Sequence, residues 1–195
     1  MKNTAPLIRI VVTGSESTGK THLTQRLAQI FDCTYSEEAA RLYVEQHPRQ
    51  LQASDVVPIA LSQISLQDKA IQNAKNLILH DTDLFSTVIY SKHYYQASPD
   101  WILEKARVQA SDLYLLCDID LPWQPEPLFR DQGSIEARRQ VHTNFLDLII
   151  KEQLNMRIIK GTGAKRTQMA IDIVEHFISE IKSTRLWIDN TAWGN

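Results

Sequence analysis

The sequence predicts an α/β fold built on a doubly wound, five-stranded parallel sheet. Short apolar runs alternate with longer segments whose apolar residues recur at helical spacing, which is the pattern of parallel strands joined by crossover helices. A glycine-rich stretch separates the first apolar run from the first helical segment. Acidic residues follow three of the runs, namely Glu37 and Glu38, Asp81 and Asp83, and Asp118 and Asp120, and a parallel sheet gathers such positions at the carboxyl ends of its strands.

The glycine-rich stretch, residues 14–21, reads GSESTGKT and has the G-x-x-x-x-G-K-T pattern of a phosphate-binding P-loop. Gly14 and Gly19 allow the backbone to turn so that successive N–H groups point at an anion. Lys20 supplies an ammonium group for the β- and γ-phosphates, and the Thr21 hydroxyl suits Mg²⁺. The predicted nucleotide-binding residues are Gly14, Ser15, Glu16, Ser17, Thr18, Gly19, Lys20 and Thr21.

The residues on both sides of this stretch support the prediction. Residues 7–13 are β-branched and nearly all apolar, as expected of an interior parallel strand. The segment that follows repeats apolar residues on one helical face, at Leu23, Leu27, Ile30 and Phe31. We therefore expect the chain to bind a nucleoside triphosphate, with Mg²⁺ at the Thr21 hydroxyl.

The other elements follow in order. Strands are predicted at residues 33–35, 76–80, 113–117 and 157–160. Helices are predicted at residues 36–46 with Ser36 as N-cap, at 54–74, from 83 to about 94, from 98–100, from 134, and at 167–183. Residues 121–133 contain three prolines, which exclude a regular helix or a central strand.

Composition argues for one ordinary globular domain over residues 1–195. A net charge of −2 gives no basic surface for nucleic acid or membranes, so we expect a small-molecule partner, no nucleic acid and no membrane. No signal-peptide core or membrane-length apolar run occurs, and we expect a cytoplasmic protein. Cys33 and Cys117 lie in apolar, strand-like segments and are predicted to be small buried hydrophobes without a disulfide.

Carboxylates after the second and third strands suggest phosphoryl-transfer chemistry. Asp81, at the end of an apolar strand, fits the role of a Mg²⁺ ligand. If the chain stays extended, the side chains of Asp81 and Asp83 point to the same side of it. Asp83 equally fits the N-cap position of the next helix. A phosphoryl acceptor needs a carboxylate that reaches its hydroxyl. Glu38, beside Arg41, fits that role, and Asp83 is the alternative. Glu37 fits the start of a helix, where a negative charge is favourable.

A segment of about residues 121–139 is predicted to form a lid of the kind found in P-loop kinases. Arg130 lies in this segment, and Arg138 and Arg139 open the next helix. Arg138 shares the helix face of Val141 and Phe145, so it points inward and needs an anionic partner in the protein or a ligand. Arg139 fits a solvated surface charge.

Two other classes of phosphate-handling protein are excluded. The sequence has no N-K-x-D guanine signature and no D-x-x-G switch after the third strand, which argues against a GTPase. The motif set of protein kinases is also absent.

Together the motifs resemble the ribosylnicotinamide kinase module of the NadR family. The resemblance covers nearly the whole chain, in the family's order. It rests on GSESTGKT at 14–21, EAAR at 38–41 with Tyr43, DTD at 81–83, DLYLL at 112–116, DIDLPW at 118–123, Arg130, and GTG at 161–163 before Arg166.

The resemblance implies a P-loop kinase that transfers the γ-phosphate of ATP to the 5′-hydroxyl of nicotinamide riboside, giving nicotinamide mononucleotide. It also implies a role for each matched residue. Lys20, Thr21 and Arg166 serve ATP and Mg²⁺, Asp81 or Asp83 serves Mg²⁺ or the riboside, Glu38 and Arg41 line the acceptor side, and Arg130 and Arg138 cap the phosphates. Trp123 fits stacking on the cationic nicotinamide ring and fits loop packing equally well.

The sequence also departs from the family pattern. Residues 124–130 read QPEPLFR, without the paired acidic residues and the glycine that often follow the family's tryptophan. No H-x-G-H nucleotidyltransferase signature occurs, and 195 residues leave no room for a helix-turn-helix domain. Two alternatives therefore stay open: a P-loop kinase of another nucleoside or nucleotide, and an NTP-binding regulatory module with slow ATPase activity.

Overall fold

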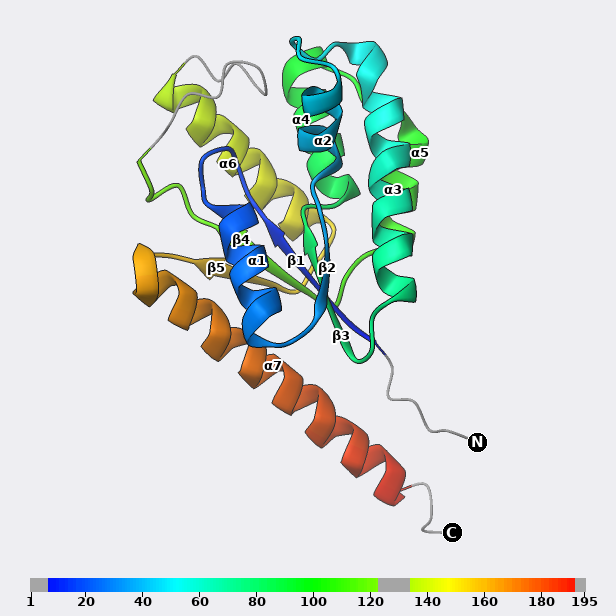
Figure 1. Ribbon diagram of the computed structural model, residues 1–195, viewed down its shortest axis with the longest axis vertical. Coiled ribbons are helices and arrows are strands. Elements are labelled where there is room, and N and C mark those ends of the chain that lie inside the picture. Colours follow the sequence, from blue (N-terminus) through cyan, green and yellow to red (C-terminus); the bar gives the residue numbers. More distant parts are fainter. Residues whose placement is uncertain (1–6, 123–133, 192–195) are drawn as a thin grey trace.

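A five-stranded parallel sheet forms the centre of the computed structural model (Figure 1). The structure describes residues 7–122 and 134–191, with side chains up to residue 183. The sheet has the strand order β2-β3-β1-β4-β5, and every pair of neighbours is parallel. The strands are β1 (Ile8–Thr13), β2 (Thr34–Ser36), β3 (Leu77–Asp81), β4 (Leu113–Cys117) and β5 (Met156–Ile159). The predicted α/β class and the parallel sheet are confirmed.

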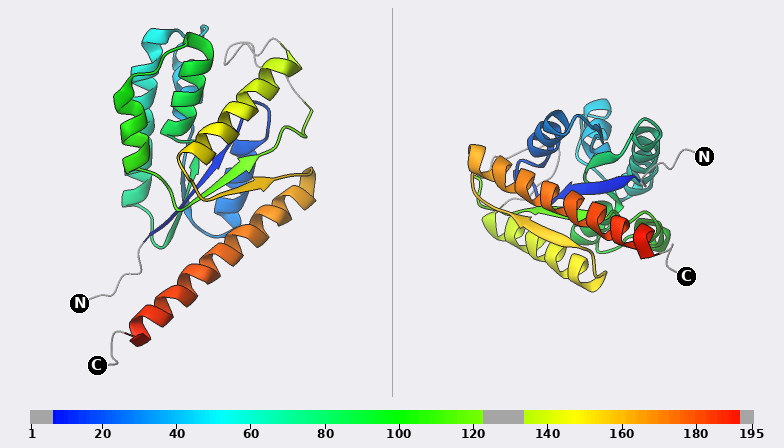
Figure 2. Two further views of the ribbon diagram at one scale, coloured as in Figure 1. Left: turned by 180° about the vertical axis from the view of Figure 1, so that it is seen from behind. Right: turned by 90° about the horizontal axis from the view of Figure 1, so that it is seen from below.

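Helices cover both faces of the sheet, as the doubly wound prediction requires (Figure 2). On β1, Ile10 and Val12 face a core that α1 and α7 complete, while Val11 faces α3, α4 and α5. This alternation follows from the two-residue repeat of a strand, and it explains why the central strand is apolar throughout. The helices are α1 (Lys20–Ile30), α2 (Ala39–Gln46), α3 (Val56–Gln72), α4 (Leu84–Tyr95), α5 (Asp100–Val108), α6 (Ile135–Lys151) and α7 (Gly163–Thr191), with a short 3₁₀ turn, η1 (Ala53–Asp55).

Several local predictions are confirmed and two are wrong. Ser134 caps α6 by accepting a hydrogen bond from the Ala137 N–H at 3.1 Å, and both cysteines are free thiols. Ser36 is not a helix cap, because it belongs to β2 and its hydroxyl bonds His80 Nδ1 at 2.7 Å; α2 begins only at Ala39. The last helix is longer than predicted at both ends. Within the described residues, no helix combines the length and apolarity needed to cross a membrane.

A buried carboxylate ties the end of α2 to the start of α3. Asp55 accepts hydrogen bonds from Arg49 Nη1 and Nη2 at 2.7 and 2.8 Å, from the Tyr43 hydroxyl at 2.9 Å and from the Gln52 N–H at 2.8 Å. The bonds from Arg49 above all hold the pKa of Asp55 well below its ordinary value, although burial acts in the opposite direction. The ionised carboxylate therefore stabilises the fold.

We expect Asp55→Asn to lower the free energy of unfolding by about 1–3 kcal/mol at neutral pH. Because the pKa of Asp55 is lower in the folded than in the unfolded chain, its stabilisation is present above the unfolded pKa and is lost as the pH falls. Urea unfolding at a series of pH values should thus show the gap between wild type and variant closing in acid. The exposed Asp68 on α3 provides the control Asp68→Asn, and a gap that stays constant with pH would contradict this role of Asp55.

Candidate nucleotide-binding site

The predicted P-loop connects β1 to α1, and its two glycines have the backbone conformations that the motif needs. Gly14 has φ +137°, and a Cβ atom there would lie 2.8 Å from the carbonyl oxygen of Cys117. Gly19 has φ +75° and is the N-cap residue of α1. L-residues rarely adopt these φ values, so the loop path depends on glycine at both positions.

Lys20 folds back over the loop. Its Nζ donates to the carbonyl oxygen of Ser15 at 2.9 Å, and the Thr18 hydroxyl donates to the same oxygen at 2.8 Å. The Lys20 side chain is only 7% exposed. The ammonium group is thereby kept at the N-terminus of α1, where the helix dipole and the loop N–H groups also favour an anion.

Two buried arginines bind the outer side of the loop. Arg138, on α6, donates from Nε to the Glu16 carbonyl at 3.2 Å and from Nη2 to the Ser17 carbonyl at 3.1 Å. Arg166, on α7, donates from Nη2 to the Thr18 carbonyl at 2.9 Å. Three consecutive carbonyl groups are thus satisfied from outside the loop, so the arginines stabilise the backbone shape that presents its N–H groups to a phosphate.

The two arginines also contact the chain after β4. Arg138 Nη1 donates to the Leu121 carbonyl at 3.0 Å, and Arg166 Nη1 bonds Asp120 Oδ1 at 2.8 Å. The inward direction predicted for Arg138 is confirmed, since it is 5% exposed. Its hydrogen bonds go to main-chain oxygens, however, and the expected anionic partners contribute at longer range: burial lowers the pKa of Arg138 while Glu16 and Asp120 raise it.

We expect Arg138→Met to weaken binding of a non-hydrolysable ATP analogue by about 1–3 kcal/mol, because the variant leaves buried carbonyl groups without donors. Isothermal titration calorimetry measures this change. Arg139 is exposed on the same helix, so Arg139→Met is the matched control and should bind like wild type. Equal affinities for all three proteins would show that the loop keeps its shape without Arg138.

Asp81 ends β3 next to the start of α1. The Thr21 hydroxyl hydrogen-bonds its carboxylate, while the buried Oδ1 has no hydrogen-bond partner among the described residues. Burial first, and the Glu38 charge second, raise the pKa of Asp81 to about 6. A hydroxyl and a carboxylate with an unsatisfied buried oxygen are hard ligands of the kind that Mg²⁺ uses together with phosphate oxygens, so these residues fit the predicted Mg²⁺ site.

Asp83 has a different environment from Asp81. Thr82 between them has φ +65°, so the chain is not extended there and the condition under which both carboxylates would share a side is not met. Asp83 Oδ1 accepts from the N–H groups of Phe85 and Ser86 at 3.0 and 3.4 Å, and the carboxylate also bonds Tyr114. Its predicted N-cap role is confirmed. Burial raises the pKa of Asp83 to about 6.

Glu38 and Arg41 lie across from the P-loop. Glu38 is the N-cap residue of α2 but its side chain does not cap the helix; its charge acts on Asp81, as does that of Arg41. Arg41 shares a cavity of about 350 Å³ with the P-loop, which joins the predicted donor and acceptor sides. The cavity is lined by Ser17, Thr18, Gly19, Lys20, Thr21, His22, Arg41, Leu121 and Pro122.

Two predicted site residues lie outside the part of the chain that the structure describes, and two buried glutamines beside the site were not predicted. Trp123 and Arg130, with most of the predicted lid, lie outside the described residues. The sequence analysis missed Gln63 and Gln67 on α3, which are buried and bond the main chain beside the predicted site residues. Their spacing of four places two amides on the buried face of an otherwise apolar helix stripe, and that pattern is visible in the sequence.

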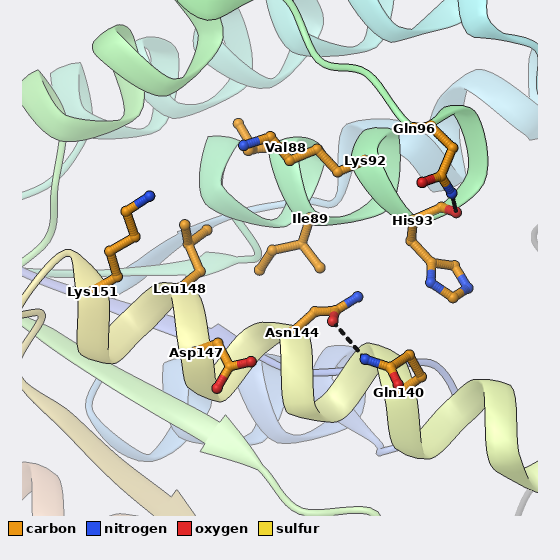
Figure 3. A pocket seen from close by; sticks show the side chains of 10 residues that line it. All are labelled: Val88, Ile89, Lys92, His93, Gln96, Gln140, Asn144, Asp147, Leu148 and Lys151. Carbon is orange, nitrogen blue, oxygen red and sulfur yellow. Dashed lines mark hydrogen bonds between the residues drawn. The ribbon is translucent and has the colours of Figure 1, made fainter.

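A second cavity lies between α4 and α6 and measures about 420 Å³ (Figure 3). Its walls carry Lys92, Lys151 and Asp147, with Asn144 accepting a hydrogen bond from Gln140 at 3.0 Å. None of the predicted site residues lines it. Although it is the larger cavity, the phosphate-binding chemistry belongs to the one beside the P-loop.

Comparison with known proteins supports the P-loop assignment. Residues 9–166 match a family model described as an AAA domain. The NadR protein of Salmonella typhimurium, a trifunctional NAD biosynthesis/regulator protein, is 31% identical over 147 residues, which cover 73% of this chain and 35% of that protein. Its Escherichia coli counterpart is 26% identical over 176 residues, or 88% of this chain and 43% of that protein. The chain therefore spans less than half the length of these relatives.

Solved structures with a similar fold also support the P-loop assignment. Crystal structures of NadR in complex with NAD and AMP-PNP, and in complex with NR, have TM-scores of 0.69 and 0.70 at 25% identity. They match 88% of this chain and 49% and 51% of theirs. Thymidylate kinase from Ehrlichia chaffeensis, at 14% identity over 87% of this chain and all of its own, shares the fold with a TM-score of 0.62. Because the AAA domain model covers most of the sequence, the chain belongs to that family of P-loop proteins, and NadR proteins are its relatives.

Proposed function

We propose that this chain is an ATP- and Mg²⁺-dependent kinase that phosphorylates the 5′-hydroxyl of nicotinamide riboside to give nicotinamide mononucleotide. One observation carries the proposal: the P-loop residues Lys20 and Thr21 converge with the carboxylates of Asp81 and Glu38 at one edge of the sheet. Arg41 and the P-loop also share a single cavity. Phosphoryl transfer needs this combination of a phosphate-binding loop, a metal ligand and an acceptor-facing carboxylate.

Each group has a distinct task in the proposed reaction. The loop N–H groups and Lys20 bind the β- and γ-phosphates and neutralise charge that develops during transfer. Thr21 and Asp81 would hold Mg²⁺, which supplies further charge neutralisation at the phosphates. Glu38 orients the acceptor hydroxyl and accepts its proton. Asp83 is assigned no proton transfer, because its carboxylate caps α4 and bonds Tyr114.

The choice of acceptor is supported by the NadR relatives. One NadR crystal structure contains NR and another contains AMP-PNP, and each match covers 88% of this chain. Positively charged Arg41 in the cavity suits the phosphates or the riboside hydroxyls rather than the nicotinamide ring, which is itself cationic.

A panel of acceptors tests the proposal. Purified protein would be incubated with ATP, Mg²⁺ and one of nicotinamide riboside, adenosine, cytidine or uridine, and ADP and phosphorylated nucleoside would be measured. Turnover should be highest with nicotinamide riboside. Higher turnover with another nucleoside would show that this nucleoside, and not nicotinamide riboside, is the acceptor. ADP release that is independent of every acceptor would contradict a kinase function.

A further inference from the structure

Glu38 occupies an unusual position for a residue at the start of a helix. An N-cap side chain normally accepts a hydrogen bond from one of the first N–H groups of its own helix. Glu38 makes no such bond, and its charge acts on Asp81 instead. Another residue must therefore accept a hydrogen bond from the main-chain N–H groups at the start of α2 if the Glu38 side chain is to face the site.

Gln63, on the neighbouring helix α3, provides that contact. Its Oε1 accepts a hydrogen bond from the Ala39 N–H at 2.9 Å, and its Nε2 donates to the Glu37 carbonyl at 3.4 Å. A single amide thus bonds the peptide groups on both sides of Glu38. The orientation of the amide follows from its partners, because an N–H group can only donate and a carbonyl can only accept.

The contact is buried and specific. Gln63 is 2% exposed, so replacing it with an apolar residue leaves the Ala39 N–H without this acceptor in a site that water does not reach. A carboxylate at position 63 could still accept from Ala39 but could not donate to Glu37. Only a side chain that both donates and accepts makes the two bonds.

We infer that Gln63 is a positioning residue for the phosphoryl acceptor: by bonding the main chain before and after Glu38, it fixes the direction of the Glu38 carboxylate. The inference rests on the proposed function of Glu38 as the acceptor-facing group. Gln63 itself touches no reacting atom. Misplacing a reacting group by about 1 Å can cost about 10²-fold in rate, which sets the size of the expected effect.

Steady-state kinetics of Gln63→Met with ATP and nicotinamide riboside test the inference. We expect kcat/KM for the acceptor to fall by about 10- to 100-fold, while KM for ATP changes by less than about twofold. A purely structural role would lower the melting temperature and the active fraction without separating the two substrates. If Gln63→Met fails to fold, Gln63→Glu replaces it, and the same selective loss is expected because the donor to Glu37 is gone.

A double-mutant cycle with Glu38→Gln makes the test specific. If Gln63 acts through Glu38, Gln63→Met should have little further effect on transfer when Glu38 is already Gln. Gln67, one turn along α3, is also buried and donates to the Thr82 carbonyl at 3.3 Å. Gln67→Met is the matched control, and its effect should add to that of Glu38→Gln.

The outcomes separate the inference from the proposed function. If the wild-type protein is active and the effects of Gln63→Met and Glu38→Gln on transfer are additive, the inference about Gln63 is overturned and the proposed function stands. A rise in KM for ATP as large as the fall in kcat/KM for the acceptor would also overturn the inference alone. A wild-type protein that transfers no phosphoryl group to any acceptor would overturn the proposed function and, with it, the role of Gln63.

Discussion

Replacement of Lys20 by alanine is expected to lower acceptor-dependent turnover by about 10²–10³-fold, the range for loss of one preorganised donor to a transition-state charge. Lys20 is 7% exposed, and its ammonium group lies over the loop at 2.9 Å from the Ser15 carbonyl oxygen. No other described lysine lines the P-loop cavity. Rates of ADP and product formation at saturating ATP measure the effect.

The fold should survive this change. Lys20→Ala removes one hydrogen bond to a carbonyl, which costs about 1 kcal/mol, and alanine favours the first turn of α1. Arg26 is exposed on α1 and bonds only locally, to Gln29, so Arg26→Ala is the control and should keep wild-type turnover. Retained activity in Lys20→Ala with an intact fold would contradict the assignment of this loop as the phosphate site.

Glu38→Gln is expected to lower kcat by about 10²–10⁴-fold, because an amide cannot accept the proton of the attacking hydroxyl. Affinity for ATP should change by less than about twofold, since the proposed role of Glu38 is toward the acceptor. The charge of Glu38 contributes to the raised pKa of Asp81. Its removal therefore favours the ionised form of Asp81 and should not weaken Mg²⁺ binding. Stopped-time product assays and nucleotide titration separate the two quantities.

Glu37 offers a matched control for this variant. It is the adjacent residue of the same type, and its side chain is exposed. Glu37→Gln should turn over like wild type. A loss confined to ATP affinity in Glu38→Gln, or equal losses in both variants, would assign the proton-accepting role to another group.

The sheet and the P-loop could be predicted because their signals are local in the sequence. An interior strand such as β4 is apolar at every position and is followed directly by a charged residue, Asp118. The helix starts at Asp83 and Ser134 were also predictable, because capping depends on residues two or three positions away. The structure begins both helices as expected and confirms the cap predicted for Asp83.

The errors have a common cause, which is that distant parts of the chain decide the local structure. Ser36 resembles a helix cap by sequence, yet its hydroxyl bonds His80 on the neighbouring strand. The left-handed backbone at Thr82 interrupts the extended chain between Asp81 and Asp83, and no glycine in the sequence indicates it. The partners of Arg138 are carbonyl groups of a loop more than a hundred residues earlier.

The most direct measurement of the central claim is the balance between the two products of a single reaction. Protein, ATP, Mg²⁺ and nicotinamide riboside would be mixed, and ADP and nicotinamide mononucleotide would be quantified by chromatography and mass spectrometry over time, with Lys20→Ala as the blank. The proposed kinase forms the two products in equal amounts, and forms each about 10²–10³-fold more slowly in the blank. ADP without nicotinamide mononucleotide, or no turnover by the wild-type protein, would contradict the claim.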